Sequence, residues 1–581
     1  MSELIDQYTI ETTWSTRLAD DIVLEATQGE LPLEMETSIL GHIDHINNNK
    51  YVETKEIYIK LLTFILKEDT RLPIQTVTRL GHIAGISDPP VAFQWGLLLI
   101  KLCRNSGLYT LQNINDKCYI FPNYTIDNDA KQKLDKLQYL PPMKQKPINW
   151  KNNEMGGWLW ENKHIILGHK FNRHDRYVAY DVLNKLQNIP WEIDTSTYLF
   201  EKKTNTTMNH KQFLRVVDQY LGQHFYFVWR YDSRGRSYTS GYDLDLQTDE
   251  YGKALVSLHK KELITQLQNL YIAIANHAGK DKLTWKERYD WTARQAIDKI
   301  KWKEPILGKK AIRALKDTTE GKPTGYVMSI DATASGLQIM AVLSGCKKTA
   351  KLVNCIDPNK RYDIYSEVVK LMNKQLKKPN QVSRPIIKDV VMTHYYNSKA
   401  KPKLLLTDEQ QNVFYKIIDG LLPGPESIME MINNCWNPEI TCNSWIMPDG
   451  HTAYIPVIKS IDGTYTDPEF GEIPLTWSQQ APSSDFRSLC PNIIHSIDGY
   501  VAREMIRNCD FQLTHIHDCF VFNPNYLQKV CQTYRKIMAD IANSNLFEDI
   551  LRQITFDSSI TVNKISTDLN VDILNSEYML S

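Results

Sequence analysis

The run from Ser383 to Tyr396 constrains the fold of this 581-residue chain more than any other stretch, because helical spacing sorts its side chains onto separate faces. Four of its residues recur every four positions and would form one stripe on an α-helix: Arg384, Lys388, Met392 and Tyr396. The aliphatic residues among the others point elsewhere and would pack the helix down. Ser383 can cap the N-terminus, and Pro385 is tolerated in the first turn. We therefore predict a helix that begins here.

The stripe places two permanent cations one turn apart and an aromatic ring two turns further on. Such a set suits a ligand with a charged tail and a flat or sugar-like body, and a nucleoside triphosphate is such a ligand. Taken alone, the same stripe also fits a solvated, charged helix face. The rest of the sequence separates these two interpretations.

Four further segments accompany this helix along the chain. They are Tyr231–Tyr238 with Asp-Ser-Arg-Gly-Arg, Ile330–Gln338 with Asp-Ala-Thr-Ala-Ser-Gly, Pro491–Gly499 with Pro-Asn-Ile-Ile-His-Ser-Ile-Asp-Gly, and His517–Phe520 with His-Asp-Cys-Phe. In this order the five segments resemble the single-subunit, phage-type DNA-dependent RNA polymerases, the family that includes the phage and mitochondrial enzymes. The resemblance runs from about Pro141 to the end of the sequence.

Two aspartates are the candidate metal ligands that this resemblance implies. Residues 325–330 predict a buried strand, so Asp331 would project from its end. Residues 511–516 and 519–522 predict two strands whose tight turn exposes Asp518, where it could face Asp331. Phosphoryl transfer uses two Mg²⁺ ions, and these favour carboxylate oxygens. Without the family context, Asp331 would be an ordinary helix cap and Asp518 a turn residue.

The resemblance also assigns roles around the substrate. Arg384 and Lys388 would grip the triphosphate, with Lys388 acting beside the two aspartates in catalysis. Tyr396 and His495 would monitor the nucleotide and the nascent base pair; otherwise they are core residues. In the related family-A DNA polymerases a glutamate five residues after the first metal aspartate excludes the ribose 2′-hydroxyl. Gly336 stands at that position here, so a ribonucleotide fits.

Two shorter motifs complete the candidate site. Arg234 and Arg236 resemble family arginines that line the template and the RNA–DNA hybrid, although an isolated Arg-Gly-Arg is usually a loop. Residues 363–365, Asp-Ile-Tyr, match a further family motif beside the palm. The family usually has glycine after the tyrosine of the helix, whereas Asn397 stands here. Asparagine tolerates a left-handed backbone better than most residues, so the turn can survive.

The implied fold is α+β and mostly helical, with the right-hand architecture of polymerases. Residues 1–140 form a short helical N-terminal domain, 141–230 a linker and reduced thumb, and 231–581 the palm and fingers. Only about 40 residues separate Trp191 from Asp232, where the family has a long thumb. A hairpin at about 450–480 has the position of the family's promoter-reading hairpin, and residues 572–581 resemble its C-terminal foot beside the active site.

The composition indicates where the protein works and which kinds of site it lacks, but it does not indicate its activity. Basic and acidic residues balance at 68 each, so no global field points to a nucleic-acid partner. The ten cysteines include no Cys-x-x-Cys pair, which argues against zinc and a disulfide framework. No stretch approaches the roughly 18 uninterrupted apolar residues of a membrane span, and the acidic N-terminus lacks a signal-like run. We expect a cytoplasmic protein without a membrane partner, in bacterial cytoplasm if a phage encodes it.

The predicted function is DNA-templated RNA synthesis from ribonucleoside triphosphates with two Mg²⁺ ions. The expected partners are the DNA template, the RNA product, the triphosphates and an accessory protein for promoter recognition or processivity. One alternative is a primase-like or DNA polymerase on the same palm; another is a catalytic subunit that needs a partner for promoter binding. A non-catalytic nucleic-acid-binding subunit would have lost at least one metal or triphosphate ligand.

Overall fold

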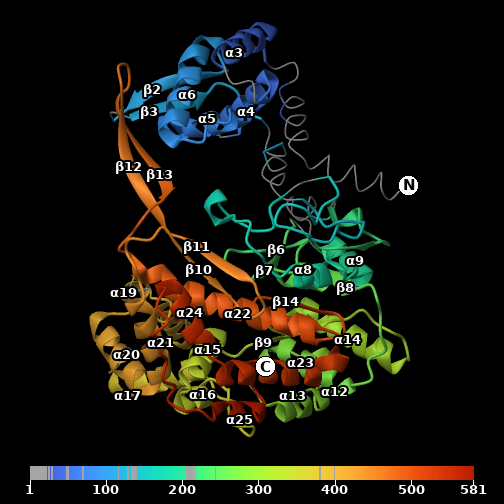
Figure 1. The fold of residues 1–581 in the computed structure, drawn as a ribbon. Coiled ribbons are helices and arrows are strands. Elements are labelled where there is room, and N and C mark those ends of the chain that lie inside the picture. The colour runs from blue at the N-terminus through green and yellow to red at the C-terminus, as the bar shows by residue number, and fades with distance from the viewer. Residues whose placement is uncertain are drawn as a thin grey trace. The chain divides into compact units, whose positions relative to one another are not determined.

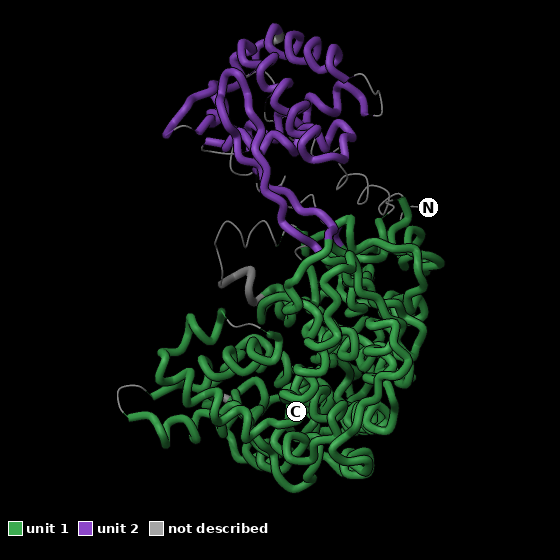
Figure 2. The backbone as a smooth tube through the Cα atoms, turned by 60° about the vertical axis from the view of Figure 1, so that its left-hand side comes forward, with its two compact units in different colours: residues 1–7, 142–457, 482–581 green, residues 8–141, 458–481 purple. Residues whose placement is uncertain are grey.

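The computed structural model describes most of the chain, in two compact units (Figure 2). One unit comprises residues 142–457 and 482–581, and the other residues 8–141 and 458–481. The described residues are 23, 27, 31–47, 52–67, 71–115, 117–126, 130–131, 140–160, 163–204, 214, 216–241, 244–377, 381–397 and 400–581. Residues 205–213 and 215, in the segment predicted to form a reduced thumb, lie outside the described residues.

The smaller unit contains helices and a small sheet. Its helices are α3 Leu33–Ile46, α4 Thr54–Leu66, α5 Thr78–Ile83 and α6 Pro89–Leu102. The apolar runs 57–66 and 91–100 lie in α4 and α6, and Asp88 caps α6 by accepting a hydrogen bond from the Val91 N–H at 3.0 Å. A three-stranded sheet, which the sequence did not predict, has the order β1 Leu72–Pro73, β3 Lys117–Pro122, β2 Tyr109–Ile114.

A long hairpin from the C-terminal half of the chain belongs to the same unit (Figure 1). Its antiparallel strands are β12 Ile458–Asp467 and β13 Gly471–Gln480. Ile473 and Leu475 are buried within the hydrophobic core formed with α3–α6. At the hairpin end, Asp467 accepts hydrogen bonds from the Lys101 ammonium at 2.6 and 2.7 Å. The unit is therefore assembled from two segments far apart in sequence.

The larger unit is built around small sheets and many helices (Figure 1). A three-stranded antiparallel sheet has the order β14 Leu513–Ile516, β15 Cys519–Phe522, β9 Met328–Asp331. A second sheet is β5 His224–Phe225, β4 Trp191–Ile193, β8 Val256–Leu258; two ribbons are β6 Trp229–Tyr231 with β7 Ser237–Thr239 and β10 Cys442–Ile446 with β11 Thr452–Pro456.

Seventeen helices surround these sheets in the described part of this unit. They are α8 Tyr180–Gln187, α9 Thr195–Thr204, α11 Glu250–Leu255, α12 Leu267–Ala275, α13 Trp285–Ala293, α14 Pro305–Thr319, α15 Ser335–Ser344, α16 Lys347–Leu352, α17 Ile364–Gln375, α18 Arg384–His394, α19 Ala400–Leu405, α20 Asp408–Leu421, α21 Pro423–Asn434, α22 Leu489–Asn508, α23 Leu527–Asn543, α24 Leu546–Thr555 and α25 Leu569–Leu574. The predicted fold class, α+β with mostly helices and small sheets, is confirmed. Among the described residues, no helix combines the length and apolar character that crossing a membrane requires.

Candidate active site

The β14–β15–β9 sheet brings the two candidate metal ligands to one edge. Both predicted strands around Asp518 are present, and β15 pairs with β9 so that Cys519 lies opposite Asp331. Asp518 therefore sits in the β14–β15 turn, beside the end of β9. His517 takes a left-handed backbone with φ of 56°, which tightens this turn. The Ala332 N–H donates to the carbonyl oxygen of Asp518 at 3.2 Å and locks the strand ends together.

A cavity of about 330 Å³ opens at this edge, and most of the predicted site residues line it. Six of the nine predicted residues line it: Asp331, Gly336, Arg384, Lys388, Tyr396 and Asp518. Surrounding protein, and then the Asp518 carboxylate, raise the pKa of Asp331 to about 7. Burial, and then Asp498, raise the pKa of Asp518 as well. Two carboxyls that resist ionisation side by side form a site that would gain from a cation.

Helix α18 supplies two of the cations of the cavity, Arg384 and Lys388. Ile387, Val390 and Val391 are fully buried beneath it, as the spacing predicted. Ser383 occupies the N-cap position, but its side chain makes no capping hydrogen bond, so the predicted cap is wrong. At the same end of the helix, Asp363 from the predicted Asp-Ile-Tyr motif accepts two hydrogen bonds from the Arg384 guanidinium, at 2.7 and 3.1 Å.

Tyr396 reaches the cavity although it lies beyond the helix. Helix α18 ends at His394, two residues earlier than the predicted stripe, and Asn397 has the left-handed φ of 60° that its position allows. A Cβ atom built on Gly336 would lie 2.8 Å from the Tyr396 hydroxyl oxygen. The missing side chain at residue 336 therefore leaves room for the Tyr396 hydroxyl beside α15.

His495 lies behind this tyrosine. The two ring centroids are 5.0 Å apart with an edge-to-face geometry. The Arg234 guanidinium donates a 2.8 Å hydrogen bond to Nδ1 of His495; because arginine only donates, that nitrogen is the acceptor. Burial, and then Arg236 and Arg234, lower the pKa of His495 to about 2. The imidazole is therefore neutral, with its Nε2 left to donate.

Both arginines of the Arg-Gly-Arg motif form hydrogen bonds with residues of helix α22, Arg234 with His495 and Arg236 with Asp498. Arg236 donates to Asp498 at 2.6 and 2.9 Å, and Arg234 donates to Asp232 at 2.7 and 3.0 Å. Both guanidinium groups thus have internal partners, and neither lines the cavity. Their predicted contact with nucleic acid stays a prediction. A Cβ atom on Gly499 would meet the Gly235 carbonyl oxygen at 2.6 Å, so the helix touches the loop backbone directly.

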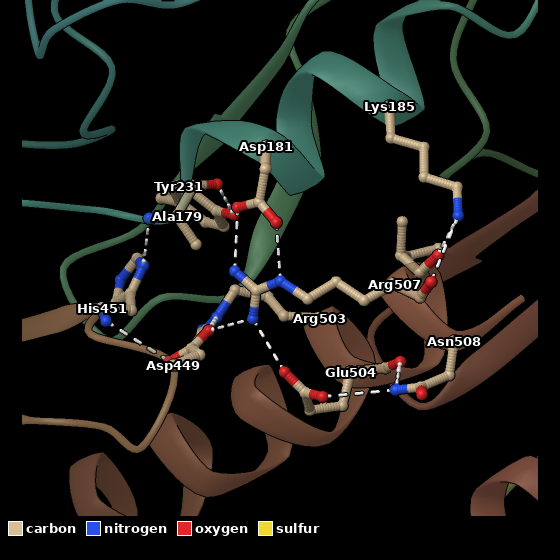
Figure 3. Close-up of polar contacts among 11 residues, drawn as sticks. Ala179, Asp181, Lys185, Tyr231, Asp449, His451, Arg503, Glu504, Arg507 and Asn508 are labelled. Atoms are coloured by element: carbon tan, nitrogen blue, oxygen red, sulfur yellow. Dashed lines mark hydrogen bonds and ion pairs between the residues drawn. The ribbon is translucent and has the colours of Figure 1, made fainter.

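A buried charge network anchors this loop further (Figure 3). Arg503 of α22 is fully buried and donates to both Asp449 oxygens at 2.6 and 3.1 Å and to the Gly235 carbonyl at 2.7 Å. Arg507 joins the same Asp449 to Asp181 of α8. Gly235 has φ of 91°, and a Cβ there would collide with Arg503. The network links the β10–β11 turn, α8 and the 232–236 loop.

Two cations that line the cavity were missed in the sequence. Lys282 lies before α13 and pairs with Asp281 at 2.9 Å. Arg361 lies before α17, and its Nε donates to the Ser581 hydroxyl at 2.9 Å. Neither stands in a motif quoted above, and only the tertiary fold brings them to the site. Ser581 also donates its backbone N–H to the Asp331 carbonyl at 2.9 Å, so the segment predicted as a foot lines the cavity.

Parts of the chain are similar in sequence to known proteins. Residues 263–402, which contain Asp331 and the α18 helix, match the family model of DNA-dependent RNA polymerase. A probable DNA-directed RNA polymerase of Gelasinospora sp. (strain G114) is 24% identical over 508 residues, which is 70% of this chain and 61% of the relative. The DNA-directed RNA polymerase of Pseudomonas phage phiKMV is 29% identical over 187 residues, 28% of this chain and 23% of the relative.

A mitochondrial DNA-directed RNA polymerase of Neurospora crassa is 28% identical over 217 residues, which is 32% of this chain and 15% of the relative. The chain thus spans less than two thirds of the length of each of these relatives. The relatives thus include a phage polymerase and a mitochondrial polymerase. Residues 263–402 therefore match the DNA-dependent RNA polymerase family, and the chain is similar to phage and mitochondrial DNA-directed RNA polymerases.

Proposed function

We propose that this chain synthesises RNA on a DNA template from ribonucleoside triphosphates, and that its larger unit works as the palm and fingers of a polymerase. The observation that carries the proposal is the meeting of Asp331 and Asp518 in one cavity with Lys388, Arg384 and Tyr396. Nucleotidyl transfer from a triphosphate needs oxygen ligands for metal near the reacting phosphate. It also needs cations near the leaving pyrophosphate.

The donor set fits Mg²⁺. Both carboxylates are hard oxygen donors at the sheet edge, and within the described residues neither has a Lys, Arg or His at ion-pair distance. No group of three or more potential ligand side chains is gathered in the described part of the chain. Mg²⁺ in nucleotidyl transfer is held by one or two carboxylates together with substrate phosphates. When bound, two such ions lower the pKa of the attacking hydroxyl and neutralise the leaving pyrophosphate.

The remaining side chains then have distinct tasks. Lys388 is exposed to the cavity and free to approach the phosphates, whereas Arg384 is pre-oriented by Asp363. Tyr396 presents its ring to the nucleotide, held in place by the neutral His495 behind it. Gly336 leaves space on the α15 side for the ribose and the tyrosine hydroxyl. DNA template and RNA product would be the macromolecular partners.

Extension of an RNA primer on a DNA template scaffold tests the proposal, with ribo- and deoxyribonucleotides compared in the presence of Mg²⁺. Asp518→Asn keeps the turn but removes a ligand charge, and we expect it to lower kcat by at least about 10³-fold. The matched control is Asp510→Asn, on the exposed surface before β14. Ribonucleotide-selective extension that only the Asp518 variant loses supports the proposal; equal use of deoxyribonucleotides favours a DNA polymerase.

A primase-like enzyme is the second candidate on this site, and product length separates it from a processive polymerase. A catalytic subunit that needs an accessory protein would extend the primer but fail to start on duplex DNA. A folded wild-type protein that extends nothing would contradict the proposal.

A further inference from the structure

Arg361 is a cation of the cavity that no motif explains. It lies three residues before the start of α17, is half-buried, and lines the same cavity as Asp331 and Lys388. Its Nε donates to the Ser581 hydroxyl at 2.9 Å, which fixes the plane of the guanidinium. Arginine carries further N–H donors in a rigid fork, and one hydrogen bond to a hydroxyl leaves most of them available.

The two nearest carboxylates each form an ion pair with another cation. Asp281 is occupied by Lys282 at 2.9 Å, and Asp363 is occupied by Arg384 at 2.7 Å. Among the described residues, no carboxylate side chain forms an ion pair with Arg361, although Lys282 and Arg384 each have one. Burial lowers the pKa of the Arg361 guanidinium; the charges of Asp281 and Asp363 offset part of this effect, and the positive charge of Arg384 adds to it. A half-buried cation beside a second cation is unfavourable unless an anion joins it.

The balance of charge in the cavity points to the same missing anion. Its lining contains the cations Lys282, Arg361, Arg384 and Lys388 and the carboxylates Asp281, Asp331 and Asp518. Asp281 pairs with Lys282, and Asp363, outside the lining, pairs with Arg384. If Asp331 and Asp518 hold metal ions, Arg361 and Lys388 remain without a carboxylate partner among the described residues. A polyphosphate chain has the charge and the oxygen acceptors to pair with them, and the planar fork of arginine binds phosphate oxygens in pairs.

We propose that Arg361 is a further triphosphate-binding residue, which takes the phosphates farthest from the reacting one and holds them as the pyrophosphate leaves. This inference rests on the proposed function for the identity of the substrate, but the binding of a polyphosphate by Arg361 can be measured without catalysis. Lys388 and Arg384, one turn apart on α18, contact the chain from one element, and Arg361 contacts it from the segment before α17.

Titration calorimetry of the full chain with inorganic tripolyphosphate tests the assignment directly. Arg361→Gln removes the charge and the fork, and we expect it to weaken tripolyphosphate binding about tenfold or more. Arg361→Lys keeps the charge without the fork and should fall between the two. The matched control is Lys360→Gln. Lys360 is the neighbouring residue, and its side chain is exposed and does not line the cavity, so this variant removes a positive charge outside the cavity.

Steady-state kinetics supply a readout that a purely structural role would not move. Because the contact is made in both the ground state and the transition state, Arg361→Gln should raise the KM for ribonucleotides about tenfold with little change in kcat, whereas Asp518→Asn lowers kcat. Tripolyphosphate affinity of Arg361→Gln within twofold of wild type would overturn the inference, as would equal weakening by Lys360→Gln or no binding by the wild-type chain. A wild type that binds tripolyphosphate but extends no RNA would contradict the proposed function and leave the arginine assignment standing.

Discussion

At the scale of single residues, the contact between Gly336 and Tyr396 decides the shape of the cavity. The nearest atom to a Cβ added at residue 336 is the tyrosine hydroxyl oxygen at 2.8 Å, and the ring carbon that bears it is at 3.5 Å. Burial, and then Asp498, raise the pKa of Tyr396 to about 12, so the hydroxyl stays protonated at neutral pH. The neutral hydroxyl can therefore donate a hydrogen bond to a ligand in the cavity.

Gly336→Ala should displace this tyrosine. Because the added methyl group overpacks the contact, we expect kcat/KM for ribonucleotides to fall about tenfold, or about 1.4 kcal/mol of transition-state stabilisation. Tyr396→Phe removes the closest atom, so the double variant should lose less than the two single effects combined. Gly420→Ala in α20 is the control, because nothing lies within 4 Å of its Cβ position. Additive losses in the double variant would contradict this explanation.

At the scale of elements, local pattern predicted what local forces determine. The spacing of Ile387, Val390 and Val391 predicted the buried face of α18, and the strand–turn–strand pattern placed Asp518 in a turn. Local pattern predicted a cap from Ser383 at the N-terminal end of α18. It did not predict the ion pair that Asp363 forms there with Arg384, because these two residues are 21 positions apart. Lys282 and Arg361 were missed for the same reason: only tertiary contacts bring them to the cavity.

The Asp449–Arg503 pair is the strongest such tertiary contact behind the site (Figure 3). Both side chains are buried, at 3% and 0% exposed, and the pair holds the loop that carries Arg234. Burial alone would raise the pKa of Asp449, but Arg503, and then His451 and Arg507, overcome it and hold that pKa well below its ordinary value. The pair therefore stabilises the fold above the unfolded-state pKa of about 3.9, and the contribution is lost as pH falls through the lower folded-state value.

Asp449→Asn should leave the buried Arg503 without its carboxylate, while Arg507 keeps Asp181 and Glu504, and should cost about 3–5 kcal/mol of local stability at pH 7. Hydrogen exchange in α22 and in the 232–236 loop measures this, since a chain with two compact units need not unfold in one step. The difference from wild type should shrink below about pH 4, where wild-type Asp449 also begins to lose its advantage. Asp485→Asn, at an exposed ion pair with Arg487, should cost less than about 1 kcal/mol. Equal protection in wild type and Asp449→Asn would contradict the anchoring role.

At the scale of the whole molecule, the smaller unit depends on a hairpin that the chain supplies more than 300 residues later. Lys101 and Asp467 are 366 residues apart in sequence, yet Asp467 is only 4% exposed in their ion pair. The sequence predicted a hairpin near 450–480 and a helical domain before residue 140, but no pattern in either could show that they share a core. The side chains of Ile473 and Leu475 complete that core, while the hairpin strands also pair with each other.

Ile473→Ala should therefore destabilise the N-terminal helices as well as the hairpin. Ile473 is 3% exposed within the shared core, so its truncation should cost about 2–5 kcal/mol. We expect faster hydrogen exchange in α6 and in β12–β13 together, with exchange in α22 unchanged because it belongs to the other unit. Ile458→Ala is the matched control, because that residue is 44% exposed at the start of the same hairpin. If exchange increases only in the hairpin, the helices hold their core without it, and the N-terminal unit is an independent domain after all.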